Sequence, residues 1–391
     1  MSEGPYIEKG YILVADSPTF DCFDFFPVLN EALKKCGYET PSPIQSQAIP
    51  PLKEGKDLLG IAQTGTGKTA AFALPLLDRL ARNKKKARPA RMRALILTPT
   101  RELASQIYES LKIYGKGLAF SNACIYGGVG ISTQIRTMGK GVDILVATPG
   151  RLLDLIREGH ILFNQLETFI LDEADRMLDM GFIRDVKKII EKLPDERQTA
   201  FFSATMAPEI LALSETLLKD PIKVEVDPSS STVEKIQQNV KFVEMVDKAN
   251  LLKKILRRRS VKSALVFTKT KEETDRVAHY LEKSYITVAS LHGDKTQTER
   301  EYALSLFRKG KIKVLVATDI ASRGINIPHV GLVVNYNLPE NPENYVHRIG
   351  RTARAGRSGM ALSFCSKEEK KLLFNIEDLI NLSIPVQEDS K

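Results

Sequence analysis

Three acidic side chains follow directly on a short apolar segment in the stretch FILDEAD. Thr168–Leu171 has the composition of a buried strand, and the carboxylates of Asp172, Glu173 and Asp175 come after its end. Carboxylates this close together repel one another and lose hydration when they are buried. A divalent cation relieves that repulsion, so the stretch indicates either an acidic helix start or a metal-assisted hydrolytic site.

A glycine-rich turn precedes these acids in the stretch AQTGTGKT. Gly65 and Gly67 allow the tight turn that directs backbone amides toward phosphate, and a helix beginning near Lys68 would add its dipole. Lys68 can reach the terminal phosphates, and the hydroxyl of Thr69 can bind Mg²⁺. A flexible loop is the alternative, since Ala62 replaces the first glycine of the usual phosphate-loop pattern.

The turn and the acids together predict hydrolysis of a nucleoside triphosphate. Parallel strands present their carboxyl ends at one edge of a sheet, and ligands bind at that edge in open α/β folds. We expect Asp172 to hold Mg²⁺, directly or through water. We expect Glu173 to polarise the water that attacks the γ-phosphate.

Polar side chains follow two other apolar segments. Ser203 and Thr205 end the stretch FFSAT, where they could relay contacts from the acids to a second domain or cap a helix. Asp319 and Arg323 occupy the polar turn of ATDIASRGINI. They are candidates for a site divided between two domains or for contacts with nucleic acid.

Arginines recur at every third position of YVHRIGRTARAGR, as Arg348, Arg351, Arg354 and Arg357. If this stretch is helical, the four cations gather on one face beside His347, which is unfavourable without an anion. Guanidinium groups suit the oxygens of a phosphoryl-transfer transition state, whereas the alternative is a solvated basic helix. The first interpretation predicts a site that is complete only when two domains close.

Composition sets broad limits on the class of protein. The 391 residues suggest two or three domains, and 43% hydrophobic with 27% charged residues is typical of globular proteins. No apolar run is long enough for a membrane span and the N-terminus lacks a signal peptide, so we expect a cytoplasmic protein. The net charge of +9 suits a polyanionic partner. The four cysteines show no CxxC pair, which favours buried free thiols.

Strand-like and helix-like segments alternate along the chain, which predicts an α/β fold of parallel sheets covered by helices on both faces. The predicted strands are Asp57–Ala62, Ala94–Thr98, Asp143–Ala147, Thr168–Leu171, Thr199–Ser203, Ser263–Thr268, Ile286–Leu291, Lys313–Thr318 and Gly331–Tyr336. The predicted helices include Ala70–Leu80, Glu102–Lys116 and Lys271–Lys283. The polar stretch DPSSST, residues 227–232, predicts a linker between domains at 1–226 and 233–391.

The motifs and their order resemble those of the DEAD-box ATP-dependent RNA helicases of superfamily 2. The matching stretches, in chain order, are GYETPSPIQ, AQTGTGKT, PTRELA, TPGR, DEAD, SAT, LHGDKTQTER, ATDIASRGI and HRIGRTAR. Each is short, but their succession over nearly the whole chain is specific. The segment RTARAG is most similar to bacterial RhlE-like members. The resemblance implies two tandem RecA-like domains joined by a short linker.

The resemblance also implies roles for individual residues. The implied catalytic residues are Lys68, Asp172 and Glu173, with Arg351 and Arg354 as arginine fingers. Phe20 would stack on adenine and Gln45 would bind its edge, and the further ATP-binding residues are Gln63, Thr64, Gly65, Thr66, Gly67, Lys68, Thr69, Gly324 and Asn326. The residues implied in coupling the domains are Asp175, Ser203, Thr205, Asp319, His347 and Arg348. The residues implied in RNA binding are Pro99, Thr100, Arg101, Gly127, Gly128, Thr148, Arg151, Gly293, Gln297, Arg300, Thr318 and Arg323.

The implied cofactors are ATP and Mg²⁺, with Thr69 and Asp172 as the metal-binding side chains. The implied partner is single-stranded or duplex RNA, bound through its sugar-phosphate backbone with low sequence specificity. In the closed state one RNA strand would be bent and its partner strand expelled. The same motifs fit two alternatives: an ATP-gated RNA clamp with little turnover, and a DNA translocase.

Three features depart from the family pattern. Ser42 stands where threonine is usual, which keeps the hydroxyl. The chain ends soon after the helicase core, so RNA specificity is low or partner proteins supply it. Asn326 stands where aspartate usually accepts from ribose hydroxyls, and losing that charge weakens the contact by roughly 0.5–1.5 kcal/mol. We therefore expect Asn326→Asp to tighten ATP binding in the closed state.

Overall fold

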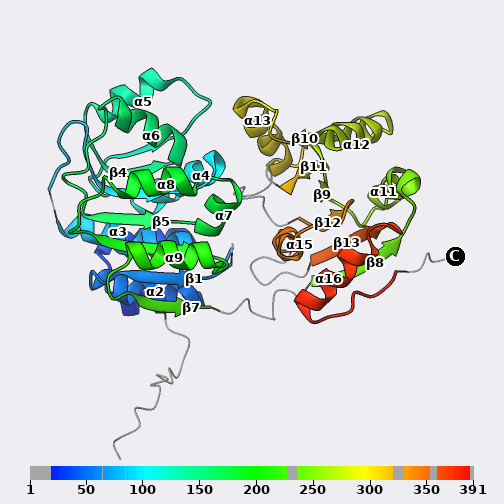
Figure 1. Cartoon of the computed structure of the whole chain (residues 1–391), viewed down its shortest axis with the longest axis horizontal. Coiled ribbons are helices and arrows are strands. Elements are labelled where there is room, and N and C mark those ends of the chain that lie inside the picture. The colour runs from blue at the N-terminus through cyan, green and yellow to red at the C-terminus, as the bar shows by residue number, and fades with distance from the viewer. Residues whose placement is uncertain are drawn as a thin grey trace, which may run out of the picture.

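The computed structural model describes residues 19–63, 65–83, 85–226, 236–319, 330–352 and 359–387. Its strands form two sheets, one in each lobe of the molecule (Figure 1). Residues 19–226 make up the lobe that we call the first domain, and residues 236–387 make up the second domain. The predicted linker, residues 227–232, lies outside the described residues.

The first domain contains a seven-stranded sheet in the order β3-β4-β2-β5-β6-β1-β7, with every pair of neighbours parallel. Its strands are β1 (Leu58–Ile61), β2 (Met92–Leu97), β3 (Asn122–Ile125), β4 (Val142–Ala147), β5 (Thr168–Leu171), β6 (Gln198–Ser203) and β7 (Ile222–Glu225). Its helices are α1 (Pro27–Lys35), α2 (Pro43–Lys53), α3 (Lys68–Arg82), α4 (Arg101–Tyr114), α5 (Ile131–Met138), α6 (Pro149–Arg157), α7 (Ala174–Asp179), α8 (Ile183–Ile190) and α9 (Pro208–Leu217), preceded by a 3₁₀ turn at Phe20–Phe23.

The second domain contains a six-stranded parallel sheet in the order β10-β11-β9-β12-β13-β8. Its strands are β8 (Ile236–Phe242), β9 (Ala264–Thr268), β10 (Val288–Leu291), β11 (Val314–Thr318), β12 (Leu332–Asn335) and β13 (Gly359–Cys365). Its helices are α11 (Lys248–Leu256), α12 (Lys271–Lys283), α13 (Gln297–Arg308), α15 (Pro342–Ile349) and α16 (Lys370–Ile380), with a 3₁₀ turn at Met245–Asp247.

The central strands are buried on both faces, which is why they are almost continuously apolar. In the first domain one face of the sheet packs against α2, α3 and α4, and the opposite face packs against α6, α7, α8 and α9. Successive residues of a strand serve opposite faces: Phe201 belongs to one core and Phe202 to the other, and both are fully buried. Burying one such ring stabilises the fold by about 2–3 kcal/mol. The predicted class, parallel sheets with helices on both faces, is confirmed.

The second domain is built in the same way, with helices packed on its parallel sheet. One core lies beneath α11 and α12, a second beneath α13, and a third beneath α15 and α16. Its edge strand β8 continues into a single bridge with the C-terminal segment, where Val240 pairs with Val386. The segment after α16 therefore extends this side of the sheet.

The predicted cysteine environment is partly wrong. Cys365 is buried, but Cys22 and Cys36 are exposed and Cys124 is intermediate, and all four are free thiols. Both exposed cysteines lie beside the short α1, where the chain turns at the surface. Among the described residues, no helix combines the length and the apolar composition needed to cross a bilayer.

Candidate nucleotide and nucleic-acid site

The glycine-rich turn follows β1 and leads directly into α3. Gly65 and Gly67 have φ values of 91° and 99°, in the left-handed region that glycine adopts without strain. Lys68 is the first residue of α3 and is 5% exposed, and its ammonium group donates to the carbonyl oxygen of Ala62 at 2.8 Å. The turn therefore holds a cation and a helix N-terminus together, an arrangement that binds phosphate. Thr64 lies outside the described residues.

The segment before α2 braces this turn. Ser42 and Gln45 form a reciprocal capping box at the start of α2, with Ser42 N donating to Gln45 Oε1 at 2.9 Å. Their remaining groups reach across: Ser42 Oγ donates to Thr66 O at 2.7 Å, and Gln45 Nε2 donates to Gly67 O at 3.1 Å. A Cβ atom at Gly67 would lie 2.5 Å from Gln45 Nε2. Sequence reasoning assigned Gln45 to adenine and missed this bracing role.

Phe20, expected to stack on adenine, is 4% exposed. Its ring packs edge-on against Phe23, with centroids 5.9 Å apart, and against Tyr38, with centroids 5.6 Å apart. These contacts place Phe20 in an aromatic cluster beside α1 and α2. Its contact with adenine stays a prediction.

The predicted acids lie at the carboxyl end of β5, two strands from β1 in the sheet. Asp172 is 2% exposed, and its Oδ1 atom has no hydrogen-bond partner among the described residues. Burial raises the pKa of Asp172 to about 7, which the charge of Lys68 opposes and that of Glu173 reinforces. The charges of Lys68 and Glu173 act on Asp172 because the three side chains lie close together; their joint role in hydrolysis stays a prediction.

Glu173 has a backbone conformation that is rare for a side-chain-bearing residue, with φ 57° and ψ 52°. Its carboxylate accepts a 2.7 Å hydrogen bond from Arg176 Nη1, and the two side chains are 4% and 3% exposed. Arg176 was not among the predicted site residues. Its position three residues after Glu173, on the same turn of a short helix, was the signal available in the sequence.

Asp175 connects the acids to the SAT stretch at the end of β6. Its backbone amide donates to Ser203 Oγ at 3.3 Å, and its Oδ2 accepts from Ala204 N at 3.2 Å. Ser203 Oγ in turn donates to Thr205 O at 2.7 Å. Asp175, Ser203 and Thr205 are thus joined across two neighbouring strands within the first domain.

At the corresponding edge of the second domain, Arg348 is enclosed in polar contacts. It donates to both oxygens of Asp319, at 2.6 and 2.7 Å, and to Asn335 Oδ1 and Asn337 O at 3.1 and 2.6 Å. Arg348 is 3% exposed. These contacts of Asp319 and Arg348, both expected to couple the domains, lie within the second domain.

The condition that the arginine-rich stretch is helical holds only as far as Ile349. α15 ends at Ile349 and Gly350 caps it, so Arg348 is the only member of the series in that helix. Arg351 follows in a turn and is 4% exposed, with His347 on the last turn of α15. Arg354 and Arg357 lie outside the described residues. Turning the chain after Gly350 avoids stacking like charges on one helical face.

Several predicted RNA-binding residues of the first domain converge on the loop after β3. Gly127 and Gly128 lie beside Arg101, and a Cβ at Gly128 would come within 2.0 Å of Arg101 Nη1. Arg151 Nη1 donates to Val129 O in the same loop, at 3.2 Å. Thr100 and Thr148, the N-cap residues of α4 and α6, set two helix N-termini near this loop, and Pro99 precedes the first of them. Cations and helix N-termini together form a surface suited to phosphates.

The predicted RNA-binding residues of the second domain lie near the carboxyl edge of its sheet. Gln297 begins α13, and Thr318 is the last residue of β11. Gly293 follows β10, and a Cβ there would meet no atom within 4 Å. Arg323, predicted to bind RNA, and Gly324 and Asn326, predicted to bind ATP, lie outside the described residues.

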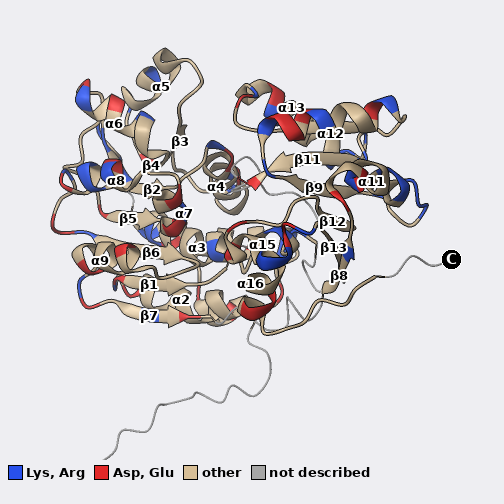
Figure 2. Ribbon diagram, turned by 45° about the vertical axis from the view of Figure 1, so that its right-hand side comes forward, with Lys and Arg blue, Asp and Glu red and all other residues tan. Residues whose placement is uncertain are grey.

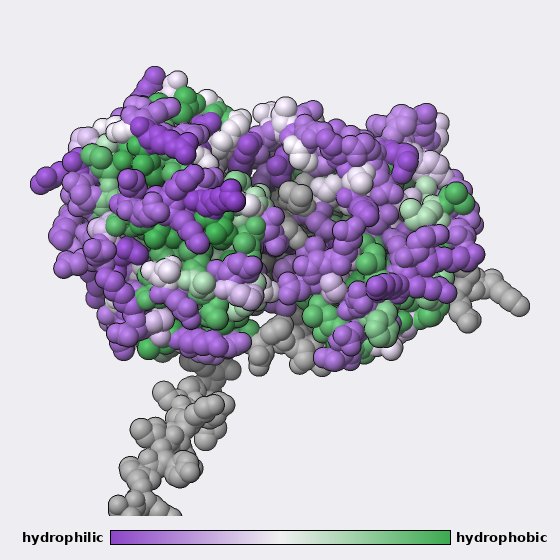
Figure 3. Space-filling view, in the orientation of Figure 1, coloured by the Kyte–Doolittle hydropathy of each residue, from purple (hydrophilic) through white to green (hydrophobic). Residues whose placement is uncertain are grey.

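The two domains face each other through these edges. Arg300 Nη2 of α13 lies 2.9 Å from Glu102 Oε1 of α4, and this ion pair joins the domains with its side chains 14% and 6% exposed. Glu343 of α15 faces α7: burial and the charges of Asp175 and Asp179 raise its pKa. Figure 1 shows α4 and α7 turned toward α13 and α15, and Figure 3 shows the surface hollowed between the lobes. We call this the closed arrangement.

Comparison with known proteins places the chain in a family. The profile described as DEAD/DEAH box helicase matches residues 42–213, and that of the helicase conserved C-terminal domain matches residues 247–356. The DEAD-box ATP-dependent RNA helicase CshA from Bacillus subtilis strain 168 is 43% identical over 359 residues, which cover 92% of this chain and 72% of CshA.

Two solved structures of known proteins superpose on this chain to different extents. S. cerevisiae Dbp5 bound to RNA and ADP BeF₃ is 31% identical, with a TM-score of 0.82 over 94% of this chain and 95% of Dbp5. A DEAD box protein from Methanococcus jannaschii is 37% identical, yet its TM-score is 0.56 over 95% of this chain and 99% of that protein. The chain therefore superposes better on RNA-bound Dbp5 than on the M. jannaschii protein, although the latter is more similar in sequence. With both profiles matched and CshA 43% identical over 92% of this chain, the chain belongs to the DEAD-box RNA helicase family.

Proposed function

We propose that this chain is an ATP-dependent RNA helicase. It hydrolyses the β–γ anhydride of ATP when RNA is bound, and it couples hydrolysis to local unwinding of short RNA duplexes or to remodelling of RNA–protein complexes. The observation that carries the proposal is the meeting of Lys68, Asp172 and Glu173 at an edge of the first sheet that faces the second domain. Phosphoryl transfer requires little covalent chemistry from a protein, so correct positioning of charges supplies most of the catalysis.

The residues present fit a magnesium ion. Asp172 Oδ1 is buried without a hydrogen-bond partner among the described residues, which is costly unless a cation completes it. Thr69 stands next to Lys68 at the start of α3. No group of three or more His, Cys, Asp or Glu side chains in the described parts of the chain could hold a metal, so water and phosphate would complete the shell. When bound, Mg²⁺ neutralises charge developing on the phosphates.

The protein groups divide the remaining work. Lys68 binds the terminal phosphates, and its present acceptor, the Ala62 carbonyl, is released when it does so. Glu173 orients the attacking water, and Arg176 holds that carboxylate in place. Arg351 and Arg354 are the proposed arginine fingers from the second domain. Gln45, Phe20, Gly324 and Asn326 are the proposed contacts to adenine and ribose.

RNA is proposed to bind across both domains. The first-domain surface formed by Arg101, Gly127, Gly128 and Arg151 receives backbone phosphates, and Gln297 and Arg300 extend it onto the second domain. Since these contacts are to phosphate and sugar, binding is tolerant of sequence and sensitive to salt. The 2′-hydroxyl lets such a surface distinguish RNA from DNA.

Three finer expectations are part of this proposal. The RhlE-like subgroup rests on the segment RTARAG alone, whereas the relative described above is a CshA. Action in the cytoplasm is carried over from the sequence as a prediction. Partner proteins that supply RNA specificity are proposed because the helicase core itself makes backbone contacts.

Steady-state ATP hydrolysis tests the proposal. The rate is measured without nucleic acid, with single-stranded RNA and with DNA of the same sequence, and Glu173→Gln serves as the inactive reference. Removing a general base lowers kcat by about 10²–10⁴-fold. Strong stimulation by RNA only, lost in Glu173→Gln, supports a helicase and leads to a duplex-unwinding assay. Equal stimulation by DNA indicates a translocase, and tight ATP-dependent RNA binding with negligible turnover indicates a clamp.

A further inference from the structure

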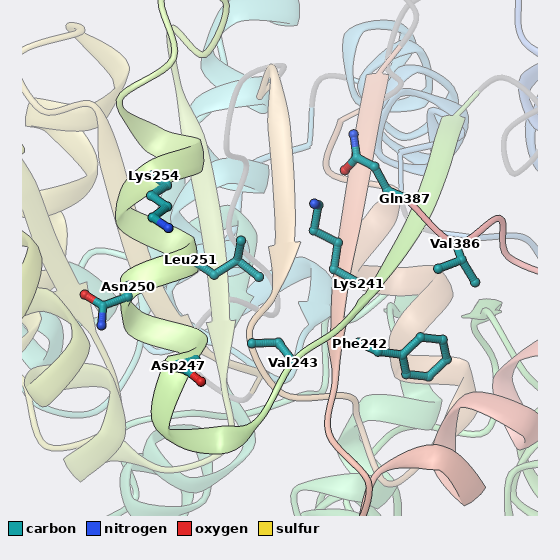
Figure 4. Close-up of a pocket in the computed structure, with 9 residues that line it drawn as sticks. All are labelled: Lys241, Phe242, Val243, Asp247, Asn250, Leu251, Lys254, Val386 and Gln387. Carbon is teal, nitrogen blue, oxygen red and sulfur yellow. The ribbon is translucent and has the colours of Figure 1, made fainter. Parts of the chain in front are cut away.

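A groove lies on the second domain, between α11 and the edge of its sheet. It has a volume of about 650 Å³ and is lined by Lys241, Phe242, Val243, Asp247, Asn250, Leu251, Lys254, Val386 and Gln387. Figure 4 shows Lys254, Leu251 and Asn250 on α11 and Lys241 on β8, with the ring of Phe242 directed away from α11. In Figures 1 and 2, α11 lies on the side of the second domain turned away from the first. The groove is therefore separate from the site between the domains.

Positive charge gathers at one end of this groove. The segment from Lys248 to Lys271 contains no Asp or Glu. Its cations near and after the end of α11 are Lys253, Lys254, Arg257, Arg258, Arg259 and Lys262. All of them except the half-buried Lys253 are exposed. A helix C-terminus attracts cations in its last turn, but that accounts only for Lys253 and Lys254.

Acidic side chains do not neutralise these cations. Elsewhere, exposed lysines on α1 and α4 pair with glutamates, as Lys35 does with Glu31 and Lys112 with Glu109. In the described part of the chain, no carboxylate lies within ion-pair distance of Lys254, Arg258 or Arg259. Three successive arginines repel one another unless an anion lies between them. The local charge therefore favours a polyanionic ligand.

Apolar side chains line part of the groove. Leu251 of α11 and Val243, which follows β8, supply this apolar surface. The ring of Phe242 lies on the other face of β8: Phe242 pairs with Cys365, which packs toward α15 and α16, and Lys370 Nζ of α16 lies 5.9 Å from the ring centroid. Asp247 is the acidic side chain of the lining and belongs to the turn before α11, whereas Lys254 is on its last turn. The groove thus offers apolar surface beside Leu251 and, toward the end of α11, cations for phosphates.

We propose that this groove is a second binding site for single-stranded RNA, with the sugar-phosphate backbone running past Lys254 toward Arg257–Arg259. A positively charged groove that follows the backbone is one means by which proteins hold single strands without reading sequence. The proposal rests on the proposed function, because an RNA held in the cleft between the domains has free ends that can reach the outer face. The site tethers long RNA and contributes nothing to hydrolysis itself.

The experiment compares RNA lengths in the full chain. RNA-stimulated ATP hydrolysis is titrated with a strand of about 10 nucleotides, which fills one binding channel, and with a strand of about 50 nucleotides. The test variant is Lys254→Glu with Arg258→Glu, and the matched control is Arg184→Glu with Lys187→Glu on exposed positions of α8. Direct binding of both strands without nucleotide is measured by fluorescence anisotropy over a range of salt concentrations.

We expect the wild-type chain to bind the long strand more tightly than the short one. The Lys254→Glu, Arg258→Glu variant should lose about tenfold in affinity for the long strand, with a salt slope smaller by about 1.4 for two lost phosphate contacts. The concentration of the short strand that gives half-maximal ATP hydrolysis by this variant should be unchanged, and so should its kcat. Phe242→Ala should bind both strands as the wild-type chain does, because its ring lies on the other face of β8.

Three outcomes would overturn the proposal. Equal weakening of both strands, or losses that the α8 control reproduces, would mean general electrostatic attraction. Unchanged binding of the long strand would mean that the groove serves another partner, such as an acidic protein segment. If the wild-type chain showed no RNA stimulation of hydrolysis, the proposed function would fail, and the anisotropy titrations would still decide whether the groove binds RNA.

Discussion

The two domains share one sheet architecture but arrange charge differently at the same edge. In the first domain Asp172 is buried with an oxygen that lacks a hydrogen-bond partner among the described residues. In the second domain Arg348 is equally buried, but four hydrogen bonds to Asp319, Asn335 and Asn337 surround it. Burying an unsatisfied charged group is costly, whereas a fully bonded one can be stable.

This difference shows how to separate ligand-binding charges from structural ones. Position at a sheet edge and burial are common to both residues, so neither identifies a site. What distinguishes them is hydrogen-bonding capacity left for a ligand. Asp172 has it, and Arg348 has used most of its donors within its own domain. Removing the two kinds of residue should therefore have different consequences.

The largest expected effect is on folding, from Arg348→Gln. Removing one partner of a buried ion pair costs about 3 kcal/mol, so the second domain should lose stability while the first does not. Arg93→Gln is the matched change in the first domain, since Arg93 is 3% exposed and pairs with Glu167 at 3.2 Å. Hydrogen exchange of β12 and β13, compared with β4 and β5, measures the two separately. Unaltered protection of β12 and β13 in Arg348→Gln would contradict a structural role.

The sequence was sufficient for most of the internal strands of the sheets. Strands such as Thr168–Leu171 and helices such as Lys271–Lys283 were predicted with the observed bounds, because continuous apolar runs and helical periodicity follow directly from burial. The internal strand β13 and the edge strands β3, β7 and β8 were missed. Burial of the three edge strands is interrupted by exposed or half-buried residues, so their composition resembles that of loops.

Prediction of the site residues from the sequence has a similar limit. Lys68 and Asp172 were predicted because their motifs carry them, and the structure brings them together. Arg176 and Glu102 were missed, since their importance lies in a partner that the fold supplies: Glu173 for Arg176, and Arg300 of the other domain for Glu102. A single sequence indicates which side chains are able to do chemistry, but contacts between distant segments require the fold.

The next largest effect should come from Arg176→Gln. Arg176 holds the Glu173 carboxylate at 2.7 Å in a buried site, and misplacing a catalytic group by about 1 Å can cost up to about 100-fold in rate. We expect kcat to fall by about 10- to 100-fold, with the KM for ATP and half-saturation by RNA nearly unchanged, and Arg176→Lys to recover part of the loss. Lys112→Gln, which breaks an exposed pair at the same spacing, is the control. An equal loss in Arg176→Lys and Arg176→Gln with raised KM would instead indicate disruption of the ATP site.

A smaller effect is expected where the two domains meet. Glu102→Gln removes the charge that faces Arg300 across the domain boundary, and a pair of this exposure contributes about 1 kcal/mol. The RNA concentration needed for half-maximal binding, measured with a non-hydrolysable ATP analogue, should rise about fivefold. The affinity for the nucleotide alone should stay constant. A double-mutant cycle with Arg300→Gln isolates the pair from any direct contact of Arg300 with RNA. Strictly additive losses would show that the two residues act independently.

The smallest effect concerns like charges in the closed arrangement. Burial and the neighbouring Asp175 and Asp179 raise the pKa of Glu343, so the closed arrangement binds protons more readily than an open one. Closure should therefore become easier as the pH falls toward that raised pKa, and this contribution is lost above it, where Glu343 is ionised and repelled. Because Glu343 is largely exposed, Glu343→Gln should favour analogue-dependent RNA binding only about twofold at neutral pH. The tighter RNA binding of Glu343→Gln relative to the wild-type chain should become smaller as the pH is lowered. An advantage that stays constant across the titration would mean that Glu343 acts through packing and not through its charge.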